Sequence, residues 1–252
     1  MNLEMPKIFF EIFNNLPRGG PGHNESTRKA YFLLRRQPTK ISLLDVGCGP
    51  GMQTIELAKL INGQIIALDN HQPFLDKLNK QAKNEGLQNK IQTVNGSMFS
   101  MDFKKEQFDV IWSEGAVYIY GFEKALKDWR IFLKIEGYFI VSEIAWIKPH
   151  PPQEIKEFFK LEYPPMKTNE ENIQIIKNSN YNLIDSFILP ESSWWKNYYH
   201  PYEKQVSALK KKYQGDVEKI SLLDSALIEI ELFRKYSKFY GYVFYIMQNK
   251  GF

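Results

Sequence analysis

The sequence predicts an α/β fold, doubly wound, with a seven-stranded, mostly parallel sheet whose last strand is antiparallel. From Ile41 onward, short apolar runs rich in β-branched residues alternate with longer segments that carry apolar residues at helical spacing. A glycine-rich turn, LLDVGCGPG at 43–51, joins the first such run to the first helical segment. The runs are almost continuously apolar, which is typical of parallel strands covered by helices on both faces.

The expected elements follow in order along the chain. Strands are expected at 41–47, 63–69, 90–96, 108–114 and 137–143, with helices at 52–61, 73–86 and 121–137 that end at Asn or Gly. A further helix begins at Asn24. After Trp146 the chain is punctuated by prolines, and then a helix and a strand over 170–190, a helical stretch over 202–236 and a strand at 240–248 are expected.

We interpret the chain as one domain with three parts. An N-terminal helical segment (1–40) precedes a core (41–146), and C-terminal strands with a helical cap (147–252) follow it. A chain of 252 residues is long enough to bury a large core in this way.

Composition restricts the classes of protein to consider. The net charge is only +4 and both signs are interspersed, so no broad nucleic-acid surface is expected; the run 210–212 of three lysines is interpreted as a solvated helix face. The single cysteine excludes an intrachain disulfide and fits a reducing compartment. No stretch approaches the ~20 apolar residues of a membrane helix. We therefore expect a cytoplasmic protein, monomeric or homodimeric, without membrane or nucleic-acid partners.

The glycine turn predicts a nucleotide-cofactor site. Gly47, Gly49 and Gly51 allow a tight turn in which backbone N–H groups approach a ligand without obstruction by Cβ atoms. Asp69 ends the second expected strand, where a carboxylate can accept hydrogen bonds from both hydroxyls of a ribose. A dinucleotide fingerprint needs its third glycine at the position of Met52, so the GxGxG spacing disfavours NAD.

Five segments, in this order and spacing, carry a resemblance to a known family: LLDVGCGPG, IIALD, NGSMFS, FDVIWSEGAVYIYG and LKIEGYFIVSE. They resemble the successive motifs of class I S-adenosylmethionine-dependent methyltransferases, over roughly 41–143. The flanking segments GPGHNESTRKAY and LPESSWWKNYY resemble one branch of the small-molecule methyltransferases. The resemblance implies the Rossmann-like methyltransferase fold, S-adenosylmethionine as cofactor and S-adenosylhomocysteine as product.

The resemblance also implies roles for individual residues. The turn from Asp45 through Gly47, Cys48 and Gly49 to Gly51 would wrap the methionine part of the cofactor, and Asp69 would hold the ribose, with Asn70 beside it. Ser97 and Met98 match the positions that read and pack the adenine. The family usually has Asp where this chain has Ser97, and a neutral hydroxyl should contribute less there than a carboxylate.

Methyl transfer from a sulfonium mainly requires alignment, so no fixed catalytic triad is expected. Glu114, at the end of the fourth expected strand, is interpreted as a general base, as a ligand of the cofactor amine or as a surface carboxylate, and His200 is a second candidate acid or base. No metal-ligand spacing is present, and no motif places a base beside Cys48. The aromatic residues of SSWWKNYYHPY, including Trp194, Trp195, Tyr198 and Tyr199, are interpreted either as a substrate-pocket wall or as core packing.

The segment RGGPGH before the core forms either a lid over the cofactor or a plain covering of the sheet, and a lid would bring Arg18 or His23 to the ligands. The predicted function is methyl transfer to N, O or C of a small metabolite. RNA or protein methylation is the alternative, although SEGAVY replaces the Pro-Pro-aromatic run of enzymes that methylate base amines or glutamine. A non-catalytic nucleoside-binding regulator is a third hypothesis. The acceptor and its reacting atom are not determined by the sequence.

Overall fold

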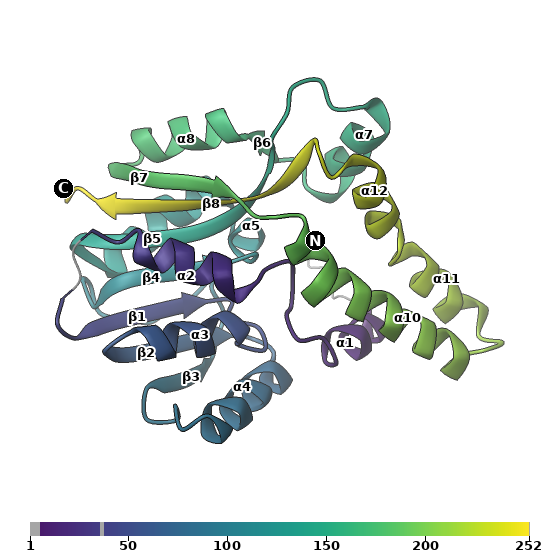
Figure 1. The fold of residues 1–252 in the computed structure, drawn as a ribbon, viewed down its shortest axis with the longest axis horizontal. Helices are drawn as coiled ribbons and strands as arrows, with labels where there is room; N and C mark the ends of the chain where they lie inside the picture. Colours follow the sequence, from purple (N-terminus) through teal and green to yellow (C-terminus); the bar gives the residue numbers. More distant parts are fainter. Residues whose placement is uncertain (1–5, 36–37, 252) are drawn as a thin grey trace.

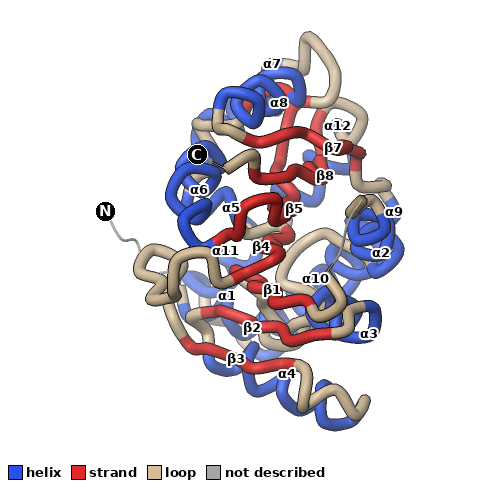
Figure 2. The backbone as a smooth tube through the Cα atoms, turned by 90° about the vertical axis from the view of Figure 1, so that its left-hand side faces the viewer, coloured by secondary structure: helices blue, strands red, loops and turns tan. Residues whose placement is uncertain are grey.

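A twisted sheet with helices on both faces forms the centre of the computed structural model, which describes residues 6–35 and 38–251 (Figure 1, Figure 2). The main strand order is β3-β2-β1-β4-β5-β8-β7. A short strand, β6, pairs with the end of β5. The bounds are β1 (Ile41–Val46), β2 (Gly63–Asp69), β3 (Ile91–Asn95), β4 (Phe108–Glu114), β5 (Leu133–Trp146), β6 (Lys167–Thr168), β7 (Tyr181–Ile188) and β8 (Tyr240–Asn249).

The helices follow the expected alternation with the strands. Those before and within the core are α1 (Lys7–Phe13), α2 (Asn24–Phe32), α3 (Met52–Leu60), α4 (Gln72–Asn84), α5 (Val117–Tyr120), α6 (Phe122–Asp128) and the short turn η1 (Trp129–Phe132). Those after the core are α7 (Gln153–Glu162), α8 (Asn169–Asn178), α9 (Ser192–Trp194), η2 (Trp195–Tyr199), α10 (His200–Lys212), α11 (Val217–Ser225) and α12 (Ile228–Tyr236).

The sheet topology confirms the predicted doubly wound fold. Strand β1 pairs in parallel with β2 on one side and with β4 on the other, so the strand order reverses beside it. The last strand, β8, is antiparallel to both β5 and β7, as expected. In such sheets, ligands bind outside the carboxyl ends of the strands at the point of reversal. This crevice lies beyond the tip of the β1 arrow, on the side where Figure 1 shows α1 and α10.

One hydrophobic cluster lies on each face of the sheet. One includes Val110, Trp112 and Ile140 with apolar residues of α1 to α4 and of the C-terminal helices. The other includes Ile111, Phe139 and Val141 with residues of α6 and α8. Alternation along each strand sends successive side chains to opposite faces, which explains why neighbouring residues join different clusters. Figure 2 shows α6 on one side of the sheet and α2 on the other.

Two expected elements were wrong in extent. The helix expected over 121–137 stops at Asp128, and β5 begins at Leu133, which is buried and pairs with Phe108 across a bulge. Pairing with β4 therefore overrides the helical spacing of this segment. The helical stretch expected over 202–236 is three helices. It breaks at Gly215, which has a φ of 93°, and Asp216 then caps α11 by accepting from the Lys219 N–H.

Helix length also bears on membrane insertion. Within the part of the chain that the structure describes, none of the helices is both long enough and apolar enough to cross a bilayer.

Candidate active site

The glycine turn between β1 and α3 requires glycine at specific positions. Gly47 has a φ of 70°, and a Cβ there would stand 2.5 Å from the Ala116 Cβ. Gly51 is the N-cap of α3 with a φ of 85°, and a Cβ there would stand 2.3 Å from the Leu78 Cδ1. L-residues rarely adopt such backbone angles, so both positions favour glycine. The turn can therefore lie close to whatever occupies the crevice.

Asp45 stabilises this turn from the side that faces the protein interior. Its side chain is fully buried, and one oxygen, Oδ2, accepts hydrogen bonds from the Thr54 hydroxyl at 2.6 Å and the Gln53 amide at 3.3 Å. Burial raises the pKa of Asp45 from its usual 3.8 to about 7. Gln53 also donates to the Cys48 carbonyl at 2.8 Å, which links Asp45 to the turn. Asp45 thus lies behind the turn, and it holds the backbone that faces the crevice.

This buried carboxyl predicts a specific dependence of stability on pH. A folded-state pKa raised above the unfolded value means that the folded protein binds the proton more tightly, so stability from this group falls as pH rises from about 4 to about 7. The free energy of unfolding of the native chain should therefore decline over this interval relative to that of Asp45→Asn. Urea unfolding at several pH values measures the difference. A difference that is constant with pH would contradict the raised pKa.

Asp69 connects the turn to the end of β2. Its Oδ2 accepts from the Gly49 N–H at 2.8 Å, and its Oδ1 accepts from the His71 N–H at 2.9 Å. The carboxylate is thus held at the carboxyl end of a strand, at the wall of the crevice. Asn70 follows it on the same wall.

A cavity of about 350 Å³ occupies the crevice. It brings together eight of the predicted site residues: Gly47, Cys48, Gly49, Asp69, Asn70, Ser97, Met98 and Glu114. It does not include Asp45, Gly51 or His200. The Cys48 side chain is buried and burial raises the pKa of its thiol well above the usual value, which disfavours the thiolate. Eight predicted residues therefore line one cavity. Asp45 lies behind the turn, Gly51 begins α3, and His200 lies elsewhere.

The opposite wall of the cavity comes from the N-terminal segment, which the sequence suggested only in outline. Phe10 and Phe13 of α1 and the stretch Arg18 to Pro21 line it. Phe10 stacks on His71, with ring centroids 4.8 Å apart, and His71 contacts the Asn14 amide oxygen at 2.8 Å. His23 does not reach the cavity but caps α2, where it accepts from the Ser26 N–H. The segment thus covers the crevice and completes the cavity.

A buried ion pair joins this segment to the end of β4. Arg18 Nη1 lies 3.2 Å from Glu114 Oε2, and both side chains are 4% exposed. Glu114 Oε1 also accepts from the Thr27 hydroxyl at 2.7 Å and from the Trp112 indole N–H at 3.0 Å. Arg18 further donates to Asn24 at 2.9 Å. Three donors therefore hold the Glu114 carboxylate at the cavity wall, and its role as a general base stays a prediction.

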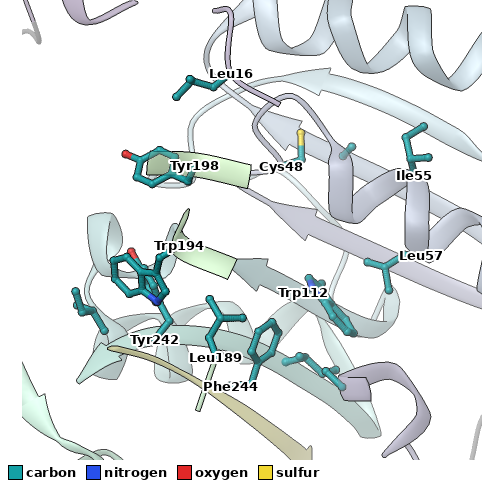
Figure 3. Close-up of a cluster of buried hydrophobic side chains, with 14 of the residues drawn as sticks. Leu16, Cys48, Ile55, Leu57, Trp112, Leu189, Trp194, Tyr198, Tyr242 and Phe244 are labelled. Carbon is teal, nitrogen blue, oxygen red and sulfur yellow. The ribbon is translucent and has the colours of Figure 1, made fainter. Parts of the chain in front are cut away.

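The aromatic cluster at 193–202 belongs mainly to the core. Trp194 is 1% exposed and stacks on Phe233, with centroids 4.3 Å apart. It also stacks on Tyr242, with centroids 5.3 Å apart (Figure 3). Tyr199 is equally buried and donates to Glu229 at 2.7 Å. His200 lies at the exposed start of α10, away from the cavity. Core packing thus accounts for Trp194, and the predicted acid–base role of His200 has no contact with the cavity.

No cluster of three or more potential metal ligands occurs among residues 6–35 and 38–251. The sequence signal that could have found the ion pair was weak. Arg18 stands alone in RGGPGH, and its partner lies 96 residues along the chain.

Comparison with known proteins shows what the chain is similar to. Residues 43–137 match the family model described as a methyltransferase domain. A sterol 24-C-methyltransferase of Aspergillus fumigatus is 28% identical over 134 residues, which cover 52% of this chain and 36% of that protein. A demethylmenaquinone methyltransferase of Lactobacillus johnsonii is 32% identical over 92 residues, or 36% of this chain and 38% of that protein. The chain thus spans less than half the length of these relatives.

Solved structures share the fold at low identity. An S-adenosylmethionine-dependent methyltransferase of Geobacter sulfurreducens, crystallised with S-adenosylhomocysteine, superposes with a TM-score of 0.83 at 16% identity, over 97% of this chain and 98% of that one. Geranyl diphosphate C-methyltransferase of Streptomyces coelicolor has a TM-score of 0.62 at 14% identity, over 89% and 75%. The matched methyltransferase domain, the glycine turn and the strand order together make this chain similar to S-adenosylmethionine-dependent methyltransferases in its core and in its fold.

Proposed function

We propose that the chain transfers the methyl group of S-adenosylmethionine to an N, O or C atom of a small, partly apolar metabolite. The observation that carries the proposal is the cavity at the reversal of strand order, where the glycine turn, Asp69 and the Ser97–Met98 segment meet. These residues fit the cofactor. Gly49 faces open space, and the Asp69 carboxylate lies beside the turn at the end of a strand, where a carboxylate can accept from ribose hydroxyls.

The chain's residues would bind the cofactor along the cavity wall. The backbone of 47–49 would face its methionine part, Asp69 and Asn70 its ribose, and Ser97 and Met98 its adenine. S-adenosylmethionine supplies a methyl group that is already activated by the positive sulfur. The protein must then orient the acceptor and exclude water, and positioning of this kind can lower a barrier by about 7–11 kcal/mol. Phe10, Phe13 and Tyr118 at the cavity wall would exclude water.

Small-molecule acceptors fit better than nucleic acid or protein. The relatives named above act, by their names, on sterols, demethylmenaquinone and geranyl diphosphate. The chain has dispersed charge, and SEGAVY, which spans the end of β4 and the turn after it, replaces a Pro-Pro-aromatic run. A non-catalytic regulator would bind the same cofactor without transfer.

Calorimetry followed by a transfer assay tests the proposal. Heat is expected with S-adenosylmethionine and S-adenosylhomocysteine but not with NAD. Labelled methyl groups should then appear in the small molecules of a metabolite extract and not in total RNA. No heat with either sulfur cofactor would refute the proposal. Label in RNA alone would favour the alternative enzyme, and tight cofactor binding with no label anywhere would favour the regulator.

A further inference from the structure

A second cavity, of about 360 Å³, lies on the face of the sheet covered by α6 and α8. Phe122, Pro165 and Ile175 give it apolar walls, and its polar groups include Glu143, Tyr163 and Asn172. Glu143 follows Ser142, whose hydroxyl accepts from the N–H of Gly115 in the cofactor cavity. Two neighbouring residues of β5 thus contact the two cavities: Ser142 bonds to the wall of the first, and Glu143 lines the second.

Glu143 makes a hydrogen bond through only one of its two carboxyl oxygens at this cavity. The residue is 2% exposed, and its Oε1 accepts from the Tyr163 hydroxyl at 2.6 Å. In the described parts of the chain, the buried Oε2 has no hydrogen-bond partner. Burying a carboxyl oxygen without a partner is costly, and the cost disappears if a bound group donates to it. A ligand that donates a hydrogen bond to Glu143 Oε2 would therefore be favoured in this cavity.

The charges at this cavity come from the carboxyls of Glu123 and Glu143 and from lysines at its wall. Burial raises the pKa of Glu143 itself to about 8. Three lysines line the cavity wall: Lys124 pairs with Asp128 at 2.9 Å, Lys127 pairs with Glu123 at 2.9 Å, and Lys167 is the third. An ammonium group would supply hydrogen-bond donors to Glu143 Oε2 together with the charge that favours the ionised carboxyl.

Tyr118 links the two cavities. It lines the cofactor cavity, and its ring contacts that of Tyr163 edge to face, with centroids 5.8 Å apart. The Tyr118 residue is 39% exposed. It thus stands between the cofactor cavity and the Tyr163 ring at the second cavity. The exposed faces of such aromatic rings also attract cations.

We propose that the second cavity is an acceptor subsite that binds an ammonium group of a small apolar amine, with Glu143 as its counter-ion. This inference rests on the proposed function, since it assigns the acceptor class for the same site. Glu143 acts here as a binding residue that positions the acceptor. An acid-bearing acceptor, held by protonated Glu143, would be the opposite chemistry and is an outcome of the test.

Calorimetry on protein saturated with S-adenosylhomocysteine provides the test, with 2-phenylethylamine, 2-phenylethanol and phenylacetate as probes. We expect the amine to bind more tightly than the alcohol or the acid. The variant Glu143→Gln should weaken amine binding roughly 10- to 100-fold, the range for loss of a hydrogen bond to a charged group, and leave alcohol binding unchanged. The control Glu203→Gln, which removes a carboxylate on α10 that pairs with Arg234 away from this cavity, should bind the amine as the native chain does.

The pH dependence gives a second readout. Ammonium binding needs ionised Glu143, so amine affinity should rise as pH increases toward about 8 and then level off. The charged or titratable groups near Glu143 are Tyr118 on α5, Glu123, Lys124 and Lys127 on α6, Tyr163 after α7, Lys167 on β6, Tyr242 and Tyr245 on β8, and Glu229 on α12. Burial also raises the pKa of Glu229, so the decisive comparison is with Glu143→Gln, in which the rise should be absent.

The outcomes are separable. Amine and alcohol binding equally, tighter binding of phenylacetate at low pH, or amine binding unchanged in Glu143→Gln would overturn the inference. If the native chain does not bind S-adenosylhomocysteine, the proposed function itself is refuted. Should Glu143→Gln unfold, Tyr163→Phe serves as a second variant: it removes only the hydroxyl that holds Oε1, so it should change amine affinity but not cofactor affinity.

Discussion

Replacement of Arg18 with methionine is expected to lower the free energy of unfolding by about 3–5 kcal/mol, the largest effect that we predict for a single substitution. Methionine keeps much of the side-chain volume but leaves the Glu114 carboxylate, 4% exposed, without its cation. The Thr27 hydroxyl and the Trp112 indole N–H would remain as its donors. Urea unfolding at neutral pH measures the loss.

Two further variants show whether the loss comes from an unpaired buried charge. The double variant Arg18→Met with Glu114→Gln removes the charge as well as its partner, and it should recover part of the lost stability. Arg234→Met is the matched control, because Arg234 pairs with Glu203 at the surface, and it should cost about 1 kcal/mol or less. Equal losses for Arg18→Met and Arg234→Met would show that burial of the pair has no special role.

Asp69→Ala is expected to weaken S-adenosylhomocysteine binding by about 1.5–3 kcal/mol, the usual range for hydrogen bonds to a charged group. The substitution removes the carboxylate proposed to hold the ribose. It also removes the acceptor for the Gly49 and His71 N–H groups, so the glycine turn loses one of its supports. Calorimetry gives the dissociation constant.

The control for Asp69→Ala is Asp76→Ala, which removes an exposed carboxylate on α4 that accepts from Gln72. Cofactor affinity should not change in that variant. Thermal unfolding of both proteins separates a loss of fold from a loss of affinity. An unchanged dissociation constant for a folded Asp69→Ala protein would mean that the ribose lies elsewhere.

Most strands and helices of the core could be predicted from local sequence patterns. The five strands up to β5 and the helices α3 and α4 were predicted to within a few residues at most boundaries, because short apolar runs and Gly or Asn stops are properties of the segments themselves. The start of β5 was not, since Leu133 becomes a strand residue only through its pairing with Phe108. The break at Gly215 and Asp216 had a local signal that the sequence prediction passed over.

The sequence by itself determined the glycine turn, the carboxylate of Asp69 and the order of strands and helices, since backbone preference and side-chain chemistry belong to each segment. Only the tertiary structure decided that Phe10 and Arg18 complete the cofactor cavity, and that Tyr163 meets Glu143 at a second one. The physical reason is that these contacts join segments far apart in the chain, 96 residues for Arg18 and Glu114, and depend on strand order and helix packing. Such neighbours leave no periodic signal in the sequence.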